Sequence, residues 1–208
     1  AESLVLIDQA LAALGEDGSA EQGRLLFDRG KAFDALGRYA EAEAAAEASL
    51  TVRRAAHGPS HELSADSLNL YANTLAAQGR HADADPLYRQ VLGLYEVLYG
   101  PKDSHVCIVL SNLANSLRRT GRARQAEPLY RRAVAIAEIS GDRVLLAQNL
   151  NNYGWFLYEA GDSVKAEIQV RRALDLAIGL VGPEHPFTGV ARANIGYSLM
   201  GQGRHAEA

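Results

Sequence analysis

Apolar residues recur at intervals of three and four along most of the chain, in paired segments that a glycine separates. One segment carries its apolar positions at Leu63, Leu68, Tyr71, Ala72 and Leu75. After Gly79, a second segment carries them at Ala82, Ala84, Leu87, Tyr88, Val91, Leu92 and Tyr95. This spacing puts each set on one face of an amphipathic helix. Glycine is favoured just past a helix end because it adopts positive φ without a Cβ clash. The pattern therefore predicts a helical hairpin.

The same hairpin pattern recurs along the whole chain. Its turn glycines return at a nearly constant interval and are Gly37, Gly79, Gly121, Gly161 and Gly203. A period of roughly 40 residues indicates a stacked repeat array rather than one closed core. We expect a single array over 1–208 with full repeats at 20–58, 61–100, 103–141 and 142–182, preceded by a second helix at 1–14 and followed by a truncated repeat at 185–208. The truncated ends predict that the chain is a segment of a longer protein.

The links between hairpins also follow a pattern. A Gly-Pro pair ends the hairpin at Gly58, Gly100 and Gly182, whereas Gly141 is followed by Asp142, which predicts a tighter turn there. Small residues lie five positions after each hairpin glycine and seven before it, where close helix crossings need them. They are Ala42, Ala84, Ala126, Ala166 and Ala208, and Gly30, Ala72, Ala114, Gly154 and Gly196.

Two prolines interrupt the helical pattern. Pro86 and Pro128 fall after the first turn of their helices, where each removes a backbone hydrogen bond. We expect them on the outer side of the array, with slightly irregular helix starts.

Composition limits the function more than it defines it. The net charge of −4 and the absence of a long apolar run argue against nucleic-acid and membrane partners. Cys107 is the single cysteine, which suits a reducing compartment, and we expect a cytoplasmic protein. His57 and His61 flank Gly58-Pro59, so they cannot share one helix face as a zinc pair would. We expect no metal site, since no three histidine, cysteine or acidic residues converge by spacing. We also expect no cofactor and no enzyme activity, and no nucleophile-elbow motif such as GxSxG is present.

At this point the residues resemble a known family. The segments GPEHP at 182–186 and AEPLYRRA at 126–133 are similar to the long variant of the tetratricopeptide repeat found in kinesin light chain and its many bacterial relatives. The resemblance covers residues 20 to 208. It implies an all-α fold, a right-handed α-solenoid of stacked antiparallel helix pairs whose first helices line a concave face.

On that basis we predict the site from first-helix residues that point away from the packed stripe. They are Asn69, Asn73, Asn112, Asn115, Arg118, Arg119, Gln148, Asn151, Asn152, Trp155, Tyr158, Asn194 and Tyr197. Asparagine is a mediocre helix former, and its amide can bind both groups of a peptide backbone. The resemblance to kinesin light chain implies this use of an Asn row. The aromatic residues would supply apolar pockets.

Several alternatives stay open at this stage. Any one of these asparagines could instead bond between adjacent repeats. Tyr153 and Phe156 are better interpreted as core residues. Arg118 and Arg119 suggest an acidic patch on the partner, although exposed charges of this kind are commonly only solvated. Arrays that capture a terminal carboxylate use lysine and arginine where this chain carries amides, so we do not expect that ligand.

The sequence thus favours a protein–protein interaction module that binds a peptide segment along its concave face. The alternative is a structural or regulatory spacer, or a self-association domain, of a larger bacterial protein such as a kinase or transcriptional regulator. Uncapped terminal helices at 1–14 and 185–208 would then allow end-to-end association.

Overall fold

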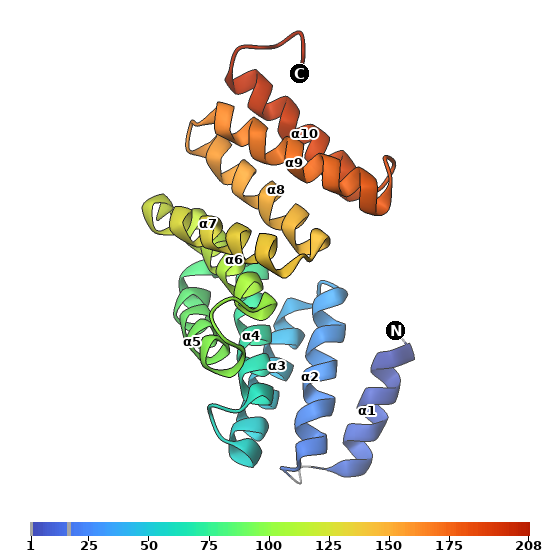
Figure 1. The fold of residues 1–208 in the computed structure, drawn as a ribbon. Coiled ribbons are helices and arrows are strands. Elements are labelled where there is room, and N and C mark those ends of the chain that lie inside the picture. The colour runs from blue at the N-terminus through green and yellow to red at the C-terminus, as the bar shows by residue number, and fades with distance from the viewer. Residues whose placement is uncertain (1, 16–17) are drawn as a thin grey trace. The chain divides into compact units, whose positions relative to one another are not determined.

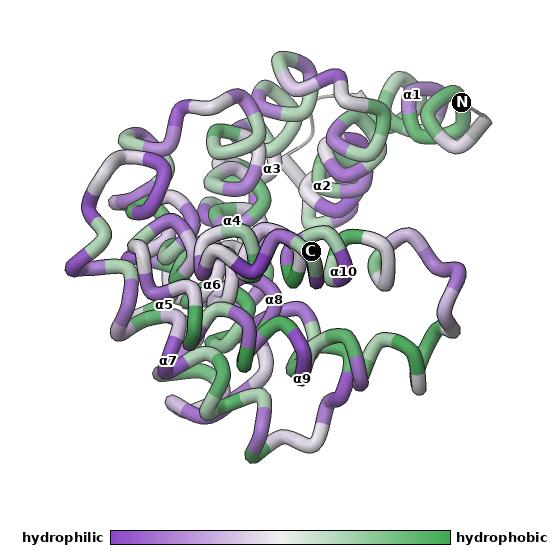
Figure 2. The backbone as a smooth tube through the Cα atoms, turned by 90° about the horizontal axis from the view of Figure 1, so that it is seen from above, coloured by the Kyte–Doolittle hydropathy of each residue, from purple (hydrophilic) through white to green (hydrophobic). Residues whose placement is uncertain are grey.

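The computed structural model describes residues 2–15 and 18–208, and across these ranges it contains ten helices and no strand. This confirms the predicted all-α class. The chain divides into two compact units, Ala1–Gly100 and Pro101–Ala208, which we describe separately. Apolar and polar positions alternate along the helices, as expected for elements that bury one face (Figure 2).

The first unit holds α1 to α5. These helices span Glu2–Leu14, Ala20–Ala35, Tyr39–His57, Glu62–Ala77 and His81–Tyr99. Each packs on the next along the chain, and the first helices of two successive hairpins, α2 and α4, also touch (Figure 1). Consecutive antiparallel helices in contact are the arrangement that the paired periodic segments predicted.

The second unit holds α6 to α10. They span Ser104–Arg119, Ala123–Ser140, Arg143–Glu159, Ser163–Val181 and Pro186–Gly201. Here α6 contacts α8 and α8 contacts α10, so three successive first helices lie side by side. Their second helices, α7 and α9, pack between them along the chain. The candidate site lies on this run of first helices.

Small side chains lie where the helices cross. Ala42, Ala84, Ala126 and Ala166 are fully buried, which confirms the predicted close crossings. The expectation was wrong for Ala208, which is exposed because residues 202–208 form turns instead of a helix.

The turns behave largely as predicted. Gly79 and its counterparts adopt φ of 71° to 87° inside the hairpins. The link at Gly141 has two residues, Gly141 and Asp142, whereas the three Gly-Pro links, 58–61, 100–103 and 182–185, have four each. Pro86 and Pro128 are exposed, and their helices continue through them without interruption.

Candidate functional site

The first helices of the second unit are joined by amide side chains. Asn194 Nδ2 on α10 donates to Asn151 Oδ1 on α8 at 2.9 Å, and Asn152 Nδ2 on α8 donates to Ser111 Oγ on α6 at 3.3 Å. Asn151 and Asn194 are each only 8% exposed. For these two residues the bond between adjacent repeats is therefore the main role that the structure shows, with little surface left for a ligand.

A second set of bonds holds asparagine against tyrosine within one hairpin. Tyr130 OH donates to Asn115 Oδ1 at 2.6 Å, and Tyr88 OH donates to Asn73 Oδ1 at 2.9 Å, the equivalent pair of the preceding repeat. Burial raises the pKa of Tyr130 to about 12, so its hydroxyl stays a donor at neutral pH. This bond uses one of the two lone pairs of the Asn115 amide oxygen and fixes the orientation of the amide.

A pocket of about 300 Å³ lies across α6, α8 and α10. It is lined by Asn115, Arg118, Asn151, Asn152, Trp155, Val190, Asn194 and Tyr197. All of these except Val190 belong to the set predicted from sequence. Val190 is half-exposed and lies four residues before Asn194 on α10, so same-face helical spacing could have identified it.

Aromatic rings form one wall of this region. The ring centroid of Trp155 lies 5.4 Å from that of Tyr158 and 5.5 Å from that of Tyr197, the latter edge-on at 78°. Tyr158 and Tyr197 are 5.8 Å apart. Tyr197 remains 43% exposed. The three rings thus make a continuous surface from α8 to α10, the type of surface that anchors binding partners.

Glu159 links the aromatic wall to a cation. It accepts a hydrogen bond from Arg118 Nη1 at 2.6 Å and another from Trp155 Nε1 at 2.8 Å. The Arg118 side chain is only 16% exposed. Arg118 is therefore paired within the protein, because the next first helix brings a carboxylate beside it. Arg119 is exposed.

The other predicted residues lie outside this pocket. Asn69 and Asn73 are half-buried on α4 of the first unit, Asn112 is half-buried on α6, and Gln148 is exposed on α8. Phe156 packs against Tyr130 with ring centroids 5.1 Å apart and is 3% exposed, so its interpretation as a core residue is confirmed.

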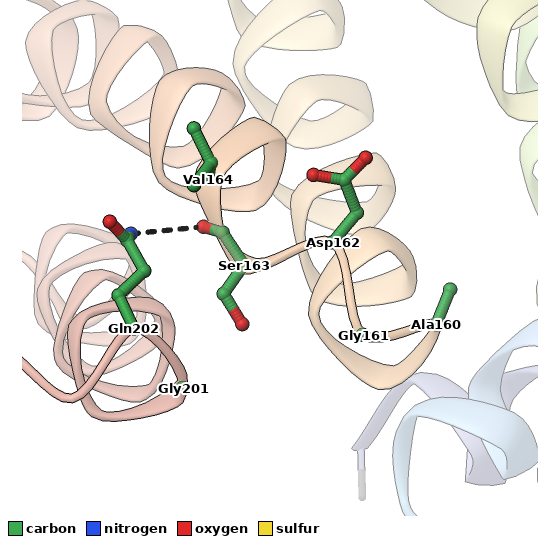
Figure 3. A pocket seen from close by; sticks show the side chains of 7 residues that line it. All are labelled: Ala160, Gly161, Asp162, Ser163, Val164, Gly201 and Gln202. Atoms are coloured by element: carbon green, nitrogen blue, oxygen red, sulfur yellow. Dashed lines mark hydrogen bonds between the residues drawn. The ribbon is translucent and has the colours of Figure 1, made fainter.

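A second, wider depression of about 620 Å³ lies beside the turn between α8 and α9 (Figure 3). There Gln202 Nε2 donates to the backbone oxygen of Ser163 at 3.2 Å. Asp162 caps α9 through Lys165, whose side-chain hydrogen bond lowers the pKa of that carboxyl. These polar groups serve helix capping and repeat stacking, so we assign this depression a structural role.

His57 and His61 lie on either side of a Gly-Pro turn. His57 ends α3 and His61 is the N-cap of α4, so they share no helix face, and their ring centroids are 4.7 Å apart because the turn folds the chain back. Within residues 2–15 and 18–208, no three histidine, cysteine or acidic residues are grouped to hold a metal. In the same ranges, no helix is long and apolar enough to cross a bilayer.

The repeated geometry agrees with a comparison against family models. A tetratricopeptide repeat model matches residues 21–96 and again 105–178. The chain belongs to the tetratricopeptide repeat family. A comparison with curated protein sequences finds no match.

Several solved tetratricopeptide repeat structures share the fold at low sequence identity. The chain is similar to BtubC (BKLC) from P. vanneervenii, with a TM-score of 0.78 and 19% identity over 100% of this chain and 83% of that one. It is also similar to a putative kinesin light chain with nearly identical repeats from Podosopora anserina, at TM-score 0.75 and 16% identity over 88% of both chains. These likenesses confirm the predicted solenoid class of helical repeats.

A third similar structure is a Rap protein complexed with Competence and Sporulation Factor. Its TM-score is 0.70 at 15% identity, over 85% of this chain. This chain spans about half of the Rap protein's length, with 49% covered. The likeness concerns the fold.

Proposed function

We propose that this protein is a protein–protein interaction module that binds an extended peptide segment of a partner across its first helices. The observation that carries this proposal is the pocket formed by α6, α8 and α10, because three successive repeats contribute amide groups and aromatic rings to one surface. The similar fold of a Rap protein solved in complex with a factor supports the use of such an array for recognition.

The amide groups suit a peptide backbone. The Asn115 oxygen accepts from Tyr130 and the Asn152 NH₂ donates to Ser111, so we assign the NH₂ of Asn115 and the oxygen of Asn152 to the ligand. One donor and one acceptor match the C=O and N–H of a peptide unit. Backbone recognition of this kind holds a chain in place, and side-chain pockets then add the choice of sequence.

The proposal can be tested by selecting peptides from a random phage-displayed library on the intact chain. Isothermal titration then compares the selected peptides on wild type and on a variant with Asn112, Asn115 and Asn152 changed to Ala. We expect affinity to fall by at least about tenfold, as when hydrogen-bonding anchors at an interface are truncated.

The matched control replaces amides on second helices. Gln90→Ala with Gln125→Ala removes the same chemistry from exposed positions of α5 and α7, and should leave affinity unchanged. Circular dichroism establishes that the variants fold. Unchanged affinity in the triple variant would rule out the proposed surface.

A second candidate function is self-association through exposed apolar side chains. Val5 and Leu6 on α1 are 55% and 66% exposed, and Val164 and Ile168 on α9 are 58% and 52% exposed. Side chains of this kind favour a contact between copies or a spacer role in a larger assembly. Light scattering over a concentration series tests it: a mass that rises with concentration supports association, and a constant monomer mass excludes it.

A further inference from the structure

In the second unit, equivalent positions of the three first helices carry different types of side chain. Asn115 on α6, Trp155 on α8 and Tyr197 on α10 are equivalent, since each lies equally far before the glycine of its own hairpin turn. The tyrosine that binds Asn115 is replaced by Val170 in the hairpin that carries Trp155. The amide and its tyrosine partner are thus lost together, and a large ring takes the place of a backbone-binding group.

The lining of this pocket is electrically balanced. Among the described residues that line the pocket, Arg118 is the only charged one. Its Nη1 donates to Glu159 Oε2 at 2.6 Å. An acidic side chain entering the pocket would have to displace Glu159, and a cationic one would meet Arg118 at short range. Both charged classes are therefore disfavoured.

Size and surface point to a single apolar side chain. A volume of about 300 Å³ is at the small end of ligand pockets. Trp155, Val190 and Tyr197 supply apolar walls, and they lie beside the amides that match a peptide unit.

We propose that this pocket is the anchor subsite of the bound peptide and takes one bulky, uncharged side chain such as leucine, methionine or phenylalanine. This inference rests on the proposed function. Asn115 and Asn152 hold the backbone of the anchor residue, and the side chain packs against Trp155, Val190 and Tyr197. The subsite selects for apolar character and against charge of either sign.

The test uses blocked amino acids as probes. The α-amides of N-acetylated leucine, phenylalanine, aspartic acid and lysine, each with its side chain free, are titrated to about 50 mM, a range suited to the millimolar affinity of so small a ligand. Trp155 is the only tryptophan, so its single indole N–H resonance in a ¹⁵N spectrum reports on the pocket. We expect saturable shifts with the two apolar amides and binding at least about tenfold weaker for both charged ones.

Two valine variants make the result specific. Val190→Phe fills the pocket and should abolish the shift, whereas Val144→Phe is the matched control and should preserve it, since both valines are 50% exposed on first helices. Equal response to all four probes, no response to either apolar amide, or binding that survives Val190→Phe would overturn the inference. If the selected peptides still lost affinity in the asparagine variant, the proposed function would hold even though the anchor subsite had failed. If their affinity did not change in that variant, both the proposed function and this inference would be wrong.

Discussion

Gln202 Nε2, at the C-cap of α10, donates to Glu167 Oε2 on α9 at 2.7 Å, and this bond has a counterpart in the first unit. There Gln78 Nε2 donates to Glu43 Oε2, also at 2.7 Å. In both cases an arginine two residues later, Arg204 or Arg80, binds the same glutamate at 2.8 Å. A Gln-Gly-Arg turn in one repeat thus holds a glutamate of the preceding repeat.

This clamp should contribute to stability in both units. Gln202→Ala and Gln78→Ala should each lower the free energy of unfolding by about 0.5–1.5 kcal/mol, the usual net value of one hydrogen bond. The double variant should be additive because the two clamps share no partner. Urea denaturation measures the effect, with the exposed Gln90→Ala as control. An equal loss of unfolding free energy in the control would show that the glutamine–glutamate bond does not contribute to stability.

Gly154 is expected to tolerate no side chain. A Cβ added there would lie 2.4 Å from Val170 Cγ2 and 3.2 Å from the backbone oxygen of Ala166. Gly154→Ala should therefore destabilise the fold by about 1–3 kcal/mol through overpacking. Thermal unfolding measures it.

The control for that variant is a helical glycine with open space. Gly93→Ala on α5 has no atom within 4 Å of the new Cβ and should stabilise by about 0.5–1 kcal/mol. Val170→Ala combined with Gly154→Ala should cost less than the sum of the two changes, because one removes the clash that the other creates. Additive losses would contradict a direct contact.

Tyr130 predicts a loss of stability in alkaline solution. Burial raises the pKa of Tyr130 from 10 in the unfolded chain to about 12 in the folded protein. The folded state therefore binds the phenolic proton more tightly than the unfolded state does. The stabilisation is complete below pH 10 and is lost as pH rises through about 12. Denaturation at pH 8 and pH 11 should show the fall, and Tyr130→Phe should reduce it. A slope unchanged in that variant would assign the effect to other tyrosines.

Cys107 should be unreactive in the folded protein. It is fully buried, its Sγ lies 3.1 Å from the backbone oxygen of Ala133, and burial raises its pKa to about 11. Because the thiolate is the reactive form, a disulfide reagent at pH 8 should label it only as fast as the protein opens. A Gln90→Cys variant provides an exposed thiol for comparison. Rapid labelling of the native wild type at Cys107 would refute the buried position.

The positions of the candidate residues could be predicted only in part. Helical periodicity placed Asn115, Trp155 and Tyr197 each away from the packed stripe of its own helix, because the angle between residues of one helix depends on local geometry alone. The pairing of Asn151 with Asn194 and of Arg118 with Glu159 could not be predicted, since each joins residues of different repeats that lie far apart in the sequence. Such contacts depend on how far one helix slides along the next.

The periodic sequence by itself determined the hairpins, their glycine turns and the small residues at the helix crossings. Spacings of three and four directly encode helix faces, and the longer period encodes the length of the repeat. Only the tertiary structure decided which polar side chains bond to each other and which stay exposed. When α6, α8 and α10 pack, Asn151 and Asn194 form a hydrogen bond with each other and Arg118 pairs with Glu159. Tyr197 stays at the surface. The reason is that the partner of a side chain depends on the register between packed helices, and the spacing of residues along the sequence does not determine that register.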